Sequence, residues 1–365
     1  MSKENILVLF GGSGVESDVS IISAIQVING FDKNKYFVIN GYLNKDGEFL
    51  ENDKFSDINS FKKEIKGNKF VLRKEKDNLY LVYNNIFKPK KRIDYVVPVF
   101  HGKGLEDGVI AGFLETLKIN YTSSGVYTSS VFQNKYCTKI LLKDFNINTV
   151  SAKYINEGMW KKDKNEILNE LEKIEFPLMV KANNLGSSIG VFKVKNKEDL
   201  YWAINTAFKY DEEVIIEKAI ENYREFNQAI VKDKLSSIEE IIGIKEYLTF
   251  DNKYYGSEVK KEVGKVEDEI RIKVSEVTKK IVEKFNIKGV IRVDYLYDLD
   301  NSVLYVNEIN TIPGSLAFYL FEDLSFGELL ELIINDSLEK KYLERLKVND
   351  FKSSILKDIN GVKFK

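Results

Sequence analysis

The stretch that decides the fold is IRVDYLYDLDNSVLYVNEINTIPG, residues 291–314 of the 365-residue chain. Two apolar runs flank DLDNS, a cluster of turn-forming residues, so a β-hairpin is the simplest interpretation. With the turn centred near the asparagine of DLDNS, Asp294 lies opposite Glu308. The same register places Arg292 opposite Asn310. Because residues two apart in a strand share a face, and opposed Cβ atoms lie about 5 Å apart, the hairpin predicts one polar cluster of four side chains.

This polar cluster is typical of a metal site that handles phosphate. Oxygen ligands without histidine or thiolate select a hard cation such as Mg²⁺, which needs only a few protein oxygens. The arginine beside them can stabilise charge that develops on a transferred phosphoryl group or an oxyanion. The competing interpretation is a surface hairpin with ordinary salt bridges, and a register slip of one residue would separate the four side chains.

A glycine- and serine-rich loop, NNLGSSIG at 183–190, is the best candidate for binding phosphates. It follows the apolar run PLMVKA, in which Lys181 supplies a positive charge. Small residues let backbone N–H groups approach an anion closely, although the loop is not a Walker A motif. Lys135 and Lys139, one turn apart on an expected helix, can also reach phosphates. An ordinary hairpin turn and solvated lysines are the alternative.

The run VIIEKAI at 214–220 is expected to form a strand whose edge faces an adenine ring. Glu217 and Lys218, with Glu225 beyond them, are then candidates for adenine and ribose contacts. Together with the phosphate loop and the metal hairpin, this strand indicates a site for ATP.

The opening loop, FGGSGVESDVS at 10–20, lies between an expected strand and an expected helix, as in a dinucleotide-binding fold. Ser17 occupies the third glycine position of G-x-G-x-x-G, and the second strand lacks the acidic residue that binds ribose. Glu16, at the helix start, would repel a pyrophosphate. The loop therefore disfavours a nicotinamide cofactor.

Composition excludes several classes of function. The 55 basic and 56 acidic residues give a net charge of −1, which offers no electrostatic argument for a nucleic-acid or membrane partner. The single cysteine, Cys137, excludes an internal disulfide framework and suits a reducing cytoplasm. The N-terminal segment reads as a strand too short for a signal peptide. With His101 as the only histidine, the chemistry must come from carboxylates, lysines, arginines and backbone.

Length and hydrophobic periodicity predict an α/β protein of three domains. Residues 1–122 combine a helix at about 17–29 with strands of a parallel sheet, expected at 5–10, 36–43 and 94–100. Residues 123–212 contain a helix at about 129–145 and two strands around the phosphate loop, at 177–182 and 190–194. Residues 213–365 contain a helix at about 275–285 and the metal hairpin, with strands at 289–298 and 302–310.

In combination, these features resemble the D-alanine–D-alanine ligase family of the ATP-grasp superfamily over essentially the full chain. Six segments match in the order of the family: FGGSGVESDVS, HGKGLEDG (101–108), NKYCTK (134–139), VKANNLGSSIG (180–190), IEKAIENYREF (216–226) and RVDYLY…VNEINTIPG (292–314). The resemblance implies a three-domain ATP-grasp architecture with a Rossmann-like N-terminal domain. It also implies ATP-dependent ligation of two D-alanines through an acyl phosphate, for peptidoglycan precursor synthesis. The expected cofactors are ATP and two Mg²⁺ ions, with Mn²⁺ as a substitute, in a cytoplasmic homodimer that acts on small amino acids without a nucleic-acid or membrane partner.

The resemblance also implies a role for individual residues. Magnesium ligands fall on Asp294, Glu308 and Asn310, with Glu308 bridging the two ions, while Arg292 stabilises the transferring phosphate and the tetrahedral intermediate. Glu16 receives the ammonium of the first D-amino acid. Ser187 and Tyr254 form hydrogen bonds with Glu16 and close the site. Contacts to ATP fall on Lys135, Lys181, Ser187, Glu217, Lys218, Ala219, Ile220, Glu225, Lys253 and Asn307, and contacts to the substrates on Glu16, His101, Gly314, Tyr319 and Leu320.

The chain departs from the family pattern at several positions. Leu105 replaces a glycine of the family's H-G-x-x-G-E-D-G motif, Ala182 a proline, and Leu185 a commonly polar residue. Tyr319 stands where a serine is frequent near the carboxylate of the second substrate, and a phenol is much larger than a serine hydroxyl. This substitution leaves open an acceptor such as D-lactate, D-serine or another amino acid. A non-catalytic nucleotide-binding homologue is disfavoured because the three metal ligands and the arginine are retained.

Overall fold

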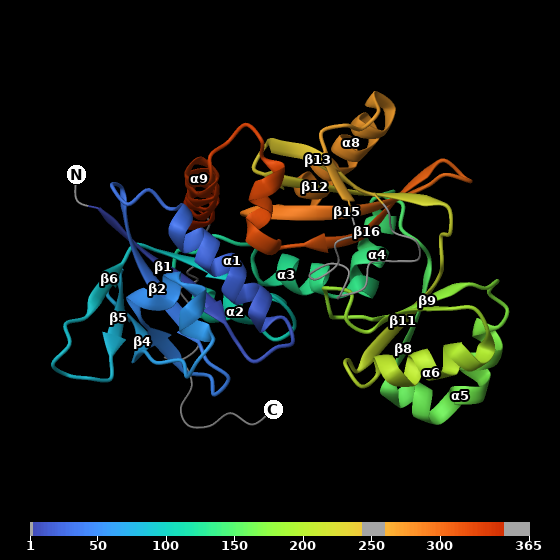
Figure 1. The fold of residues 1–365 in the computed structure, drawn as a ribbon, viewed down its shortest axis with the longest axis horizontal. Coiled ribbons are helices and arrows are strands. Elements are labelled where there is room, and N and C mark those ends of the chain that lie inside the picture. Colours follow the sequence, from blue (N-terminus) through green and yellow to red (C-terminus); the bar gives the residue numbers. More distant parts are fainter. Residues whose placement is uncertain (1–2, 243–259, 347–365) are drawn as a thin grey trace, which may run out of the picture.

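The computed structural model describes residues 3–242 and 260–346, which form three β-sheets with helices packed against them (Figure 1). The first sheet has the strand order β6-β5-β4-β3-β2-β1-β7. Its strands are β1 (Glu4–Gly11), β2 (Tyr36–Leu43), β3 (Phe49–Glu51), β4 (Asn68–Glu75), β5 (Asn78–Tyr83), β6 (Lys91–Ile93) and β7 (Tyr95–Val99). The expected parallel pairing holds for β2-β1-β7, whereas β3 to β6 extend the sheet in antiparallel fashion.

Strand β1 is buried on both faces, which explains its uninterrupted apolar sequence. Ile6, Val8 and Phe10 belong to a core shared with α1 (Ser17–Gly30), while Leu7 and Leu9 belong to a core shared with α2 (Val109–Thr116). The short 3₁₀ helices η1 (Asp53–Ser56) and η2 (Ile58–Phe61) follow β3. Because β1 runs parallel to β2 and β7, the loop that follows it and carries Glu16 lies at the carboxyl ends of these strands.

The second sheet is antiparallel, with the order β10-β9-β11-β8. Its strands are β8 (Ala152–Asn156), β9 (Leu178–Ala182), β10 (Val191–Val194) and β11 (Glu213–Lys218), and α5 (Glu157–Leu171) and α6 (Lys197–Ala207) pack against it (Figure 1). The expected boundary at 212 assigns β11 to the third domain, but β11 pairs with β8 and β9. We therefore propose that the boundary follows Lys218.

The helix expected at 129–145 is divided into α3 (Val126–Gln133) and α4 (Lys135–Asp144). The break falls at Asn134, whose side chain accepts a 2.9 Å hydrogen bond from the backbone N–H of Cys137. This is an N-cap interaction, which starts a new helix. The cap sets the direction of α4 and places Lys135 in its first turn.

The third sheet has the order β14-β13-β12-β15-β16. Its strands are β12 (Tyr223–Val231), β13 (Lys234–Ile242), β14 (Lys260–Val263), β15 (Val290–Asp298) and β16 (Val303–Asn310), and α8 (Asp268–Phe285) covers one face. In the hairpin β15–β16, Asp294 lies opposite Glu308 and Arg292 opposite Asn310, as expected. Closer to the turn the pairing is shifted by one residue, so Tyr295 lies opposite Val306. The sequence patterns did not indicate β12, β13 or β14, and the helix begins earlier than expected.

One hydrophobic core joins the first domain to the C-terminal part of the chain. Residues of α1 pack with residues of η3 (Gly314–Leu320) and α9 (Phe326–Arg345), including Leu316, Leu320, Leu329, Leu330 and Ile333. Gly30, at the end of α1, has no side chain because a Cβ there would lie 2.7 Å from the ring of Phe326. The first and third domains therefore share a common core.

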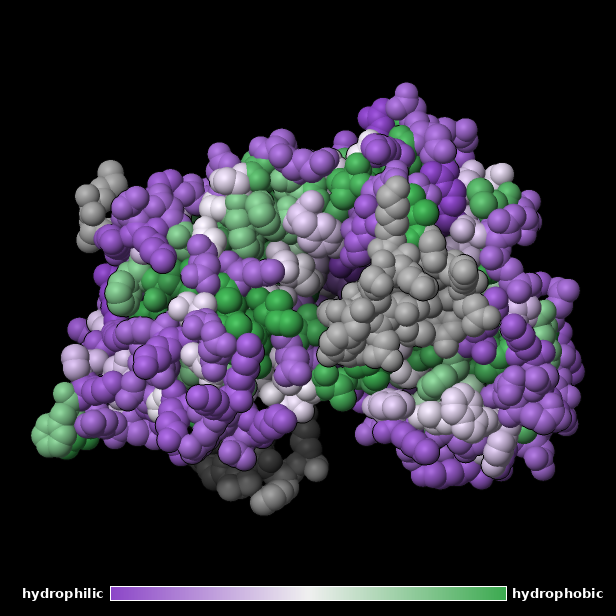
Figure 2. Space-filling model, in the orientation of Figure 1, coloured by the Kyte–Doolittle hydropathy of each residue, from purple (hydrophilic) through white to green (hydrophobic). Residues whose placement is uncertain are grey.

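The outer surface is mainly hydrophilic on the face drawn in Figure 2. An apolar knob protrudes at its left end, where the loop between β5 and β6 exposes 88% of Ile86 and 89% of Phe87. None of the described helices combines the length and the apolar composition needed to cross a membrane.

Candidate active site

The β15–β16 hairpin gathers the four side chains predicted from the sequence. The guanidinium of Arg292 donates two hydrogen bonds of 2.6 Å to the two carboxylate oxygens of Asp294. Asn310 Nδ2 donates a third, of 3.2 Å, to Asp294 Oδ2. Burial disfavours the charge of Arg292, but the adjacent Asp294 carboxylate raises its pKa well above the ordinary value. The arginine is therefore a permanent, oriented positive charge.

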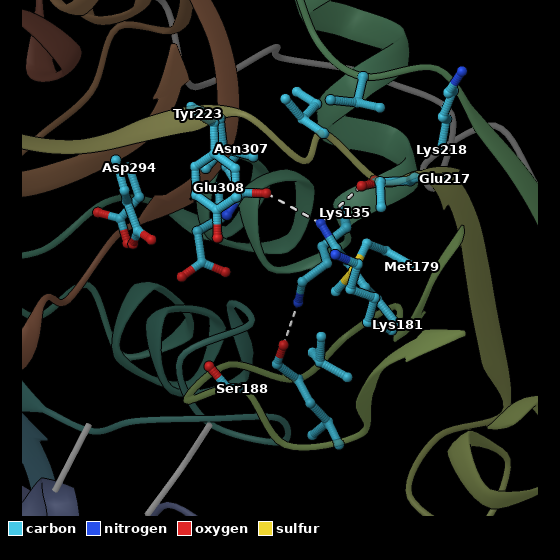
Figure 3. Close-up of a pocket in the computed structure, with 18 residues that line it drawn as sticks. Lys135, Met179, Lys181, Ser188, Glu217, Lys218, Tyr223, Asp294, Asn307 and Glu308 are labelled. Atoms are coloured by element: carbon cyan, nitrogen blue, oxygen red, sulfur yellow. Dashed lines mark hydrogen bonds and ion pairs between the residues drawn. The ribbon is translucent and has the colours of Figure 1, made fainter. Parts of the chain in front are cut away.

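A pocket of about 980 Å³, including space open to solvent, lies between the second and third sheets (Figure 3). Figure 3 shows the carboxylates of Asp294 and Glu308 on one side and the amines of Lys135 and Lys181 on the other. Of the predicted nucleotide contacts, the lining includes Lys135, Lys181, Glu217, Lys218, Ala219, Ile220, Glu225 and Asn307. Cations facing carboxylates across a cleft are a suitable arrangement for a metal–polyphosphate ligand.

Glu217 organises the lysines of this pocket. Its two oxygens lie 2.8 Å from Lys139 Nζ and 2.7 Å from Lys181 Nζ, and the glutamate is 2% exposed. Burial opposes its charge, but the two ammonium groups outweigh burial and lower its pKa to about 2. Lys181 also donates a 3.1 Å bond to Asn307 Oδ1. Glu217 therefore holds Lys181 in place, while Lys139, a second candidate for phosphate binding, is engaged by Glu217.

Two predicted nucleotide contacts differ in position from the expectation. The Lys218 ammonium pairs with Glu175 at the surface, so its side chain points away from the pocket (Figure 3). In the phosphate loop Ser188, not Ser187, lines the pocket, because Ser187 turns toward Glu16. Lys135 donates to the backbone oxygen of Leu185, and burial lowers its pKa.

Residues that the sequence did not single out also line the nucleotide pocket: Val150, Met179, Val191, Lys193, Tyr223 and Leu296. Met179 could have been found, because it shares a strand face with Lys181, two residues away. Tyr223 and Leu296 depend on the pairing of β12 with β15, which no local pattern reveals.

Glu16 forms a second site at the end of this pocket. Ser187 Oγ donates a 2.6 Å hydrogen bond to Glu16 Oε1, while Oε2 is buried without a hydrogen-bond partner among the described residues. A Cβ at Gly102 would lie 2.7 Å from Oε2, so only glycine leaves room beside this oxygen. A buried, unpartnered carboxylate oxygen favours a cationic group such as an ammonium.

Glu106 is a site residue that the sequence reasoning missed, although HGKGLEDG contains it. Its Oε2 accepts from the backbone N–H of Gly102 and its Oε1 from that of Ile312, both at 3.1 Å. Burial and the nearby Glu16 carboxylate raise its pKa to about 8. Glu106 thus joins the first domain to the turn after the metal hairpin. The signal was available in the motif as two acids, Glu106 and Asp107, between Gly104 and Gly108.

The remaining predicted substrate contacts differ in how close they lie to the Arg292–Asp294 pair. His101 Nε2 lies 3.1 Å from Ser23 Oγ, and the ring is 6% exposed, so it is held in the first domain. The hydroxyl of Tyr319 lies 3.5 Å from Arg292 Nη1, which brings it beside the Arg292–Asp294 pair. Leu320 is fully buried in the core, and Gly314 begins η3. Lys253 and Tyr254 lie outside the described residues.

Comparisons with known proteins agree with this geometry. Family models described as "D-ala D-ala ligase N-terminus" and "D-ala D-ala ligase C-terminus" match residues 5–124 and 141–327. The chain is 36% identical to a D-alanine–D-alanine ligase of Thermosipho africanus, across 92% of this chain and 93% of the relative. The D-alanine–D-alanine ligase B of Clostridium tetani is 30% identical to the chain, across 92% of this chain and 95% of that relative.

Solved structures are similar as well. The crystal structure of the Helicobacter pylori D-alanine–D-alanine ligase is 30% identical, covers 91% of this chain and 98% of its own, and has a TM-score of 0.74. The Bacillus anthracis enzyme complexed with ATP is 27% identical, covers 93% of this chain and 99% of its own, and has a TM-score of 0.68. Both likenesses extend over all three sheets.

Proposed function

The chain belongs to the D-alanine–D-alanine ligase family, and from this we propose that it joins two D-alanines in an ATP-dependent reaction on an ATP-grasp fold. The dipeptide product serves peptidoglycan precursor synthesis, as in the family. The observation that carries the proposal is Glu16, whose unpartnered buried oxygen lies beside a pocket of lysines and carboxylates. An amino-acid site next to a polyphosphate site is what an ATP-dependent ligase needs.

In the first half-reaction, the carboxylate of the first D-alanine attacks the γ-phosphorus of ATP. The bond to the bridging oxygen breaks, ADP leaves, and an acyl phosphate forms. Glu16 holds the ammonium of the substrate, while Lys135 and Lys181 bind the phosphates. Arg292 lies at the carboxylate side of the pocket and stabilises charge on the transferring group.

Asp294, Glu308 and Asn310 fit Mg²⁺, because they present oxygen donors from one face of the hairpin. The carboxamide oxygen of Asn310 adds a third donor to the two carboxylates, and such oxygens are the ligands that Mg²⁺ prefers. Magnesium bound there would neutralise phosphate charge. We propose that these three residues hold the two ions expected in the family.

In the second half-reaction, the deprotonated amine of the second D-alanine attacks the acyl carbon. A tetrahedral intermediate forms, the carbon–oxygen bond to phosphate breaks, and inorganic phosphate leaves. Tyr319 and Arg292 lie together, and we propose that they bind the carboxylate of the acceptor. The buried position of Glu16 and Ser187 protects the acyl phosphate from water.

The test is phosphate release from ATP across single and paired D- and L-amino acids, with D-serine and D-lactate as further acceptors. We expect release with D-alanine and identification of the dipeptide by mass spectrometry. No release with any pair would contradict the ligase proposal. Release only with other acceptors would retain the chemistry and change the second substrate.

Tyr319 decides the acceptor in this proposal, since it occupies the position of the frequent serine. We expect Tyr319→Phe to raise the Michaelis constant of the acceptor by roughly 10-fold or more, because a hydrogen bond to a charged carboxylate is lost. The Michaelis constant for ATP should stay unchanged. If Tyr319→Phe and the wild type have the same Michaelis constant for every acceptor, Tyr319 does not contact the acceptor.

Assembly and location complete the proposal. We propose a cytoplasmic homodimer, as the family resemblance and the single cysteine favour. Sedimentation of the purified chain at several concentrations tests the dimer.

A further inference from the structure

An ion pair between an exposed lysine and a buried aspartate joins the first domain to the second, and neither residue is assigned to the reaction. Lys103, in the loop 101–108, extends its ammonium to within 2.8 Å of Asp211 Oδ1, in the segment between α6 and β11. The Asp211 side chain is 0% exposed and that of Lys103 is 41% exposed. The lysine therefore reaches from the rim of the junction to a carboxylate that has no access to solvent.

Asp211 also fixes the start of the phosphate loop. Its Oδ2 accepts a 2.6 Å bond from the backbone N–H of Asn184 and a 3.0 Å bond from Asn184 Nδ2. The backbone oxygen of Asn184 accepts a further 2.8 Å bond from Gln133 Nε2. Three residues after Asn184, Ser187 donates to Glu16. The loop 184–187 is thus held at one end by Asp211 and at the other by Glu16.

The surroundings of Asp211 make the lysine necessary. The depression at this junction is also lined by the acids Asp107, Glu212 and Glu213. Burial lowers the pKa of Lys103, but Asp211 and its acidic neighbours outweigh burial and raise it. Removing one partner of a buried pair leaves an uncompensated charge, which costs far more than the intact pair contributes. Without the Lys103 ammonium, Asp211 would keep the hydrogen bonds from Asn184 and a 2.9 Å bond from the backbone N–H of Glu212, but no positive charge would balance its carboxylate beside the three other acids.

We propose that Lys103 and Asp211 are positioning residues for the first substrate, acting through the loop 184–187 on Glu16. The first domain supplies Glu16 and Lys103, and the second supplies Ser187 and Asp211. One contact between two domains allows rotation about it, whereas separated contacts restrict their relative orientation. The Lys103–Asp211 pair adds to the Ser187–Glu16 bond and to a 2.7 Å bond from Ser130 Oγ to the backbone oxygen of Asp107. The pair thereby holds the free oxygen of Glu16 at a constant distance from the phosphate-binding lysines. The kinetic part of this inference rests on the proposed ligase activity.

The test uses the full-length enzyme and five variants. Lys103→Met removes the ammonium and keeps the stem, Lys103→Arg keeps the charge, and Asp211→Asn removes the negative charge. The double variant Lys103→Met/Asp211→Asn removes both charges. Lys209→Met is the matched control, because Lys209 is exposed, lies two residues before Asp211 and takes part in no described ion pair.

We expect Lys103→Met to raise the Michaelis constant for the first D-alanine by roughly 10-fold, since the buried Asp211 carboxylate loses a charged hydrogen bond whose strength is reduced by the exposure of the lysine. The affinity for ATP, measured by direct binding, should change less than twofold. Lys103→Arg and the control should resemble the wild type. The double variant should be no worse than Lys103→Met, because the two side chains act as one unit.

A second measurement does not depend on activity. Hydrogen exchange of the amides at 183–188 should be faster in Lys103→Met than in the wild type, with exchange in β11 unchanged. If Lys103→Met does not fold, Asp211→Asn carries the same comparison, because it leaves only a partly exposed lysine without a partner.

Three results would overturn the inference: Lys103→Met behaves like the control, the effects of the two single variants add in the double variant, or the affinities for ATP and D-alanine fall in parallel. If the wild type consumes no ATP with any D-amino acid, the proposed ligase activity fails, and hydrogen exchange alone decides the role of the pair.

Discussion

Glu106 shows how a single buried side chain can carry a measurable pH dependence. Its pKa is raised to about 8, from an ordinary value near 4.5, by burial and by Glu16. A group whose pKa is raised on folding stabilises the native state most below its ordinary pKa. That contribution is lost as the pH rises through about 8. Above this pH the folded protein must hold a charged carboxylate next to another.

We therefore expect Glu106→Gln to gain stability relative to the wild type as the pH rises from 5 to 9, by on the order of a few kcal/mol in the free energy of unfolding. Denaturant titrations at several pH values measure this difference. Glu276→Gln, at an exposed position of α8, is the control for the same chemical change. A pH-independent difference between Glu106→Gln and the wild type would contradict the prediction.

Glu308 gives the corresponding prediction for catalysis. Glu308→Gln removes one carboxylate of the proposed metal site while keeping its size. We expect turnover to fall at least 100-fold, because the neutral amide binds Mg²⁺ poorly and phosphate charge is then less well compensated. Phosphate release measures the effect, with Glu276→Gln again as the control. Near-normal turnover would contradict the metal site and favour the alternative interpretation of the hairpin as one with ordinary salt bridges.

At the scale of elements, the two faces of β15 have separate tasks, one toward the site and one toward α8. Tyr295 is fully buried on the α8 side, and its hydroxyl lies 2.7 Å from Thr278 Oγ1. Thr278 Oγ1 in turn donates a 2.9 Å bond to Gln228 of β12. This small network aligns β15, α8 and β12 without reaching the reaction centre.

Tyr295→Phe should therefore lower the free energy of unfolding by about 1 kcal/mol, because one hydrogen bond is lost while the ring stays packed. The Michaelis constants should remain those of the wild type, since Arg292 and Asp294 project from the opposite face. Denaturant titration and steady-state kinetics on the same preparation check both parts. A changed Michaelis constant for ATP would mean that the two faces are coupled.

Local sequence was sufficient to predict the hairpin but not its neighbours. The turn cluster and the alternation around it predicted Asp294 opposite Glu308 and Arg292 opposite Asn310, and both pairs are confirmed. Between Asp294 and the turn the expected register is wrong by one residue, because an irregularity after Asp294 pairs Tyr295 with Val306. Strands β12 and β13 carry polar residues such as Asn227 and Glu239 on the site face, and these obscure the apolar alternation. Strand β11 was recognised as a strand, but which sheet it joins depends on pairing with segments far away in sequence.

At the scale of the whole molecule, the nucleotide pocket is shared by two sheets, so ATP must bind the folded arrangement alone. A ligand that binds only the native state stabilises it by about 2.7 kcal/mol at 100 times its dissociation constant. We expect ATP with Mg²⁺ to raise the melting temperature by a few degrees, as measured by calorimetry. Lys181→Met should abolish most of this shift and Lys209→Met none of it. An unchanged shift in Lys181→Met would exclude that lysine from phosphate binding.

Contacts between domains are the part of the site that sequence alone could not provide. Residue types and motif order indicated Glu16, Lys181 and the metal hairpin as separate sites. The bond from Ile312 to Glu106 joins residues 206 positions apart, and it exists only because η3 packs on α1. Such a contact is a product of domain packing, for which no local pattern exists.

The core shared by α1, η3 and α9 also has a consequence for how the chain is made. During translation, α1 is synthesised some 300 residues before α9, the helix that covers it. The apolar face of α1 therefore stays exposed to solvent and prone to aggregation until α9 has been synthesised. A shortened chain ending at residue 124 should keep this apolar face open and bind a hydrophobic dye such as ANS, whereas the full chain should not. A helix near residue 330 thus completes the core of a domain that begins near residue 4.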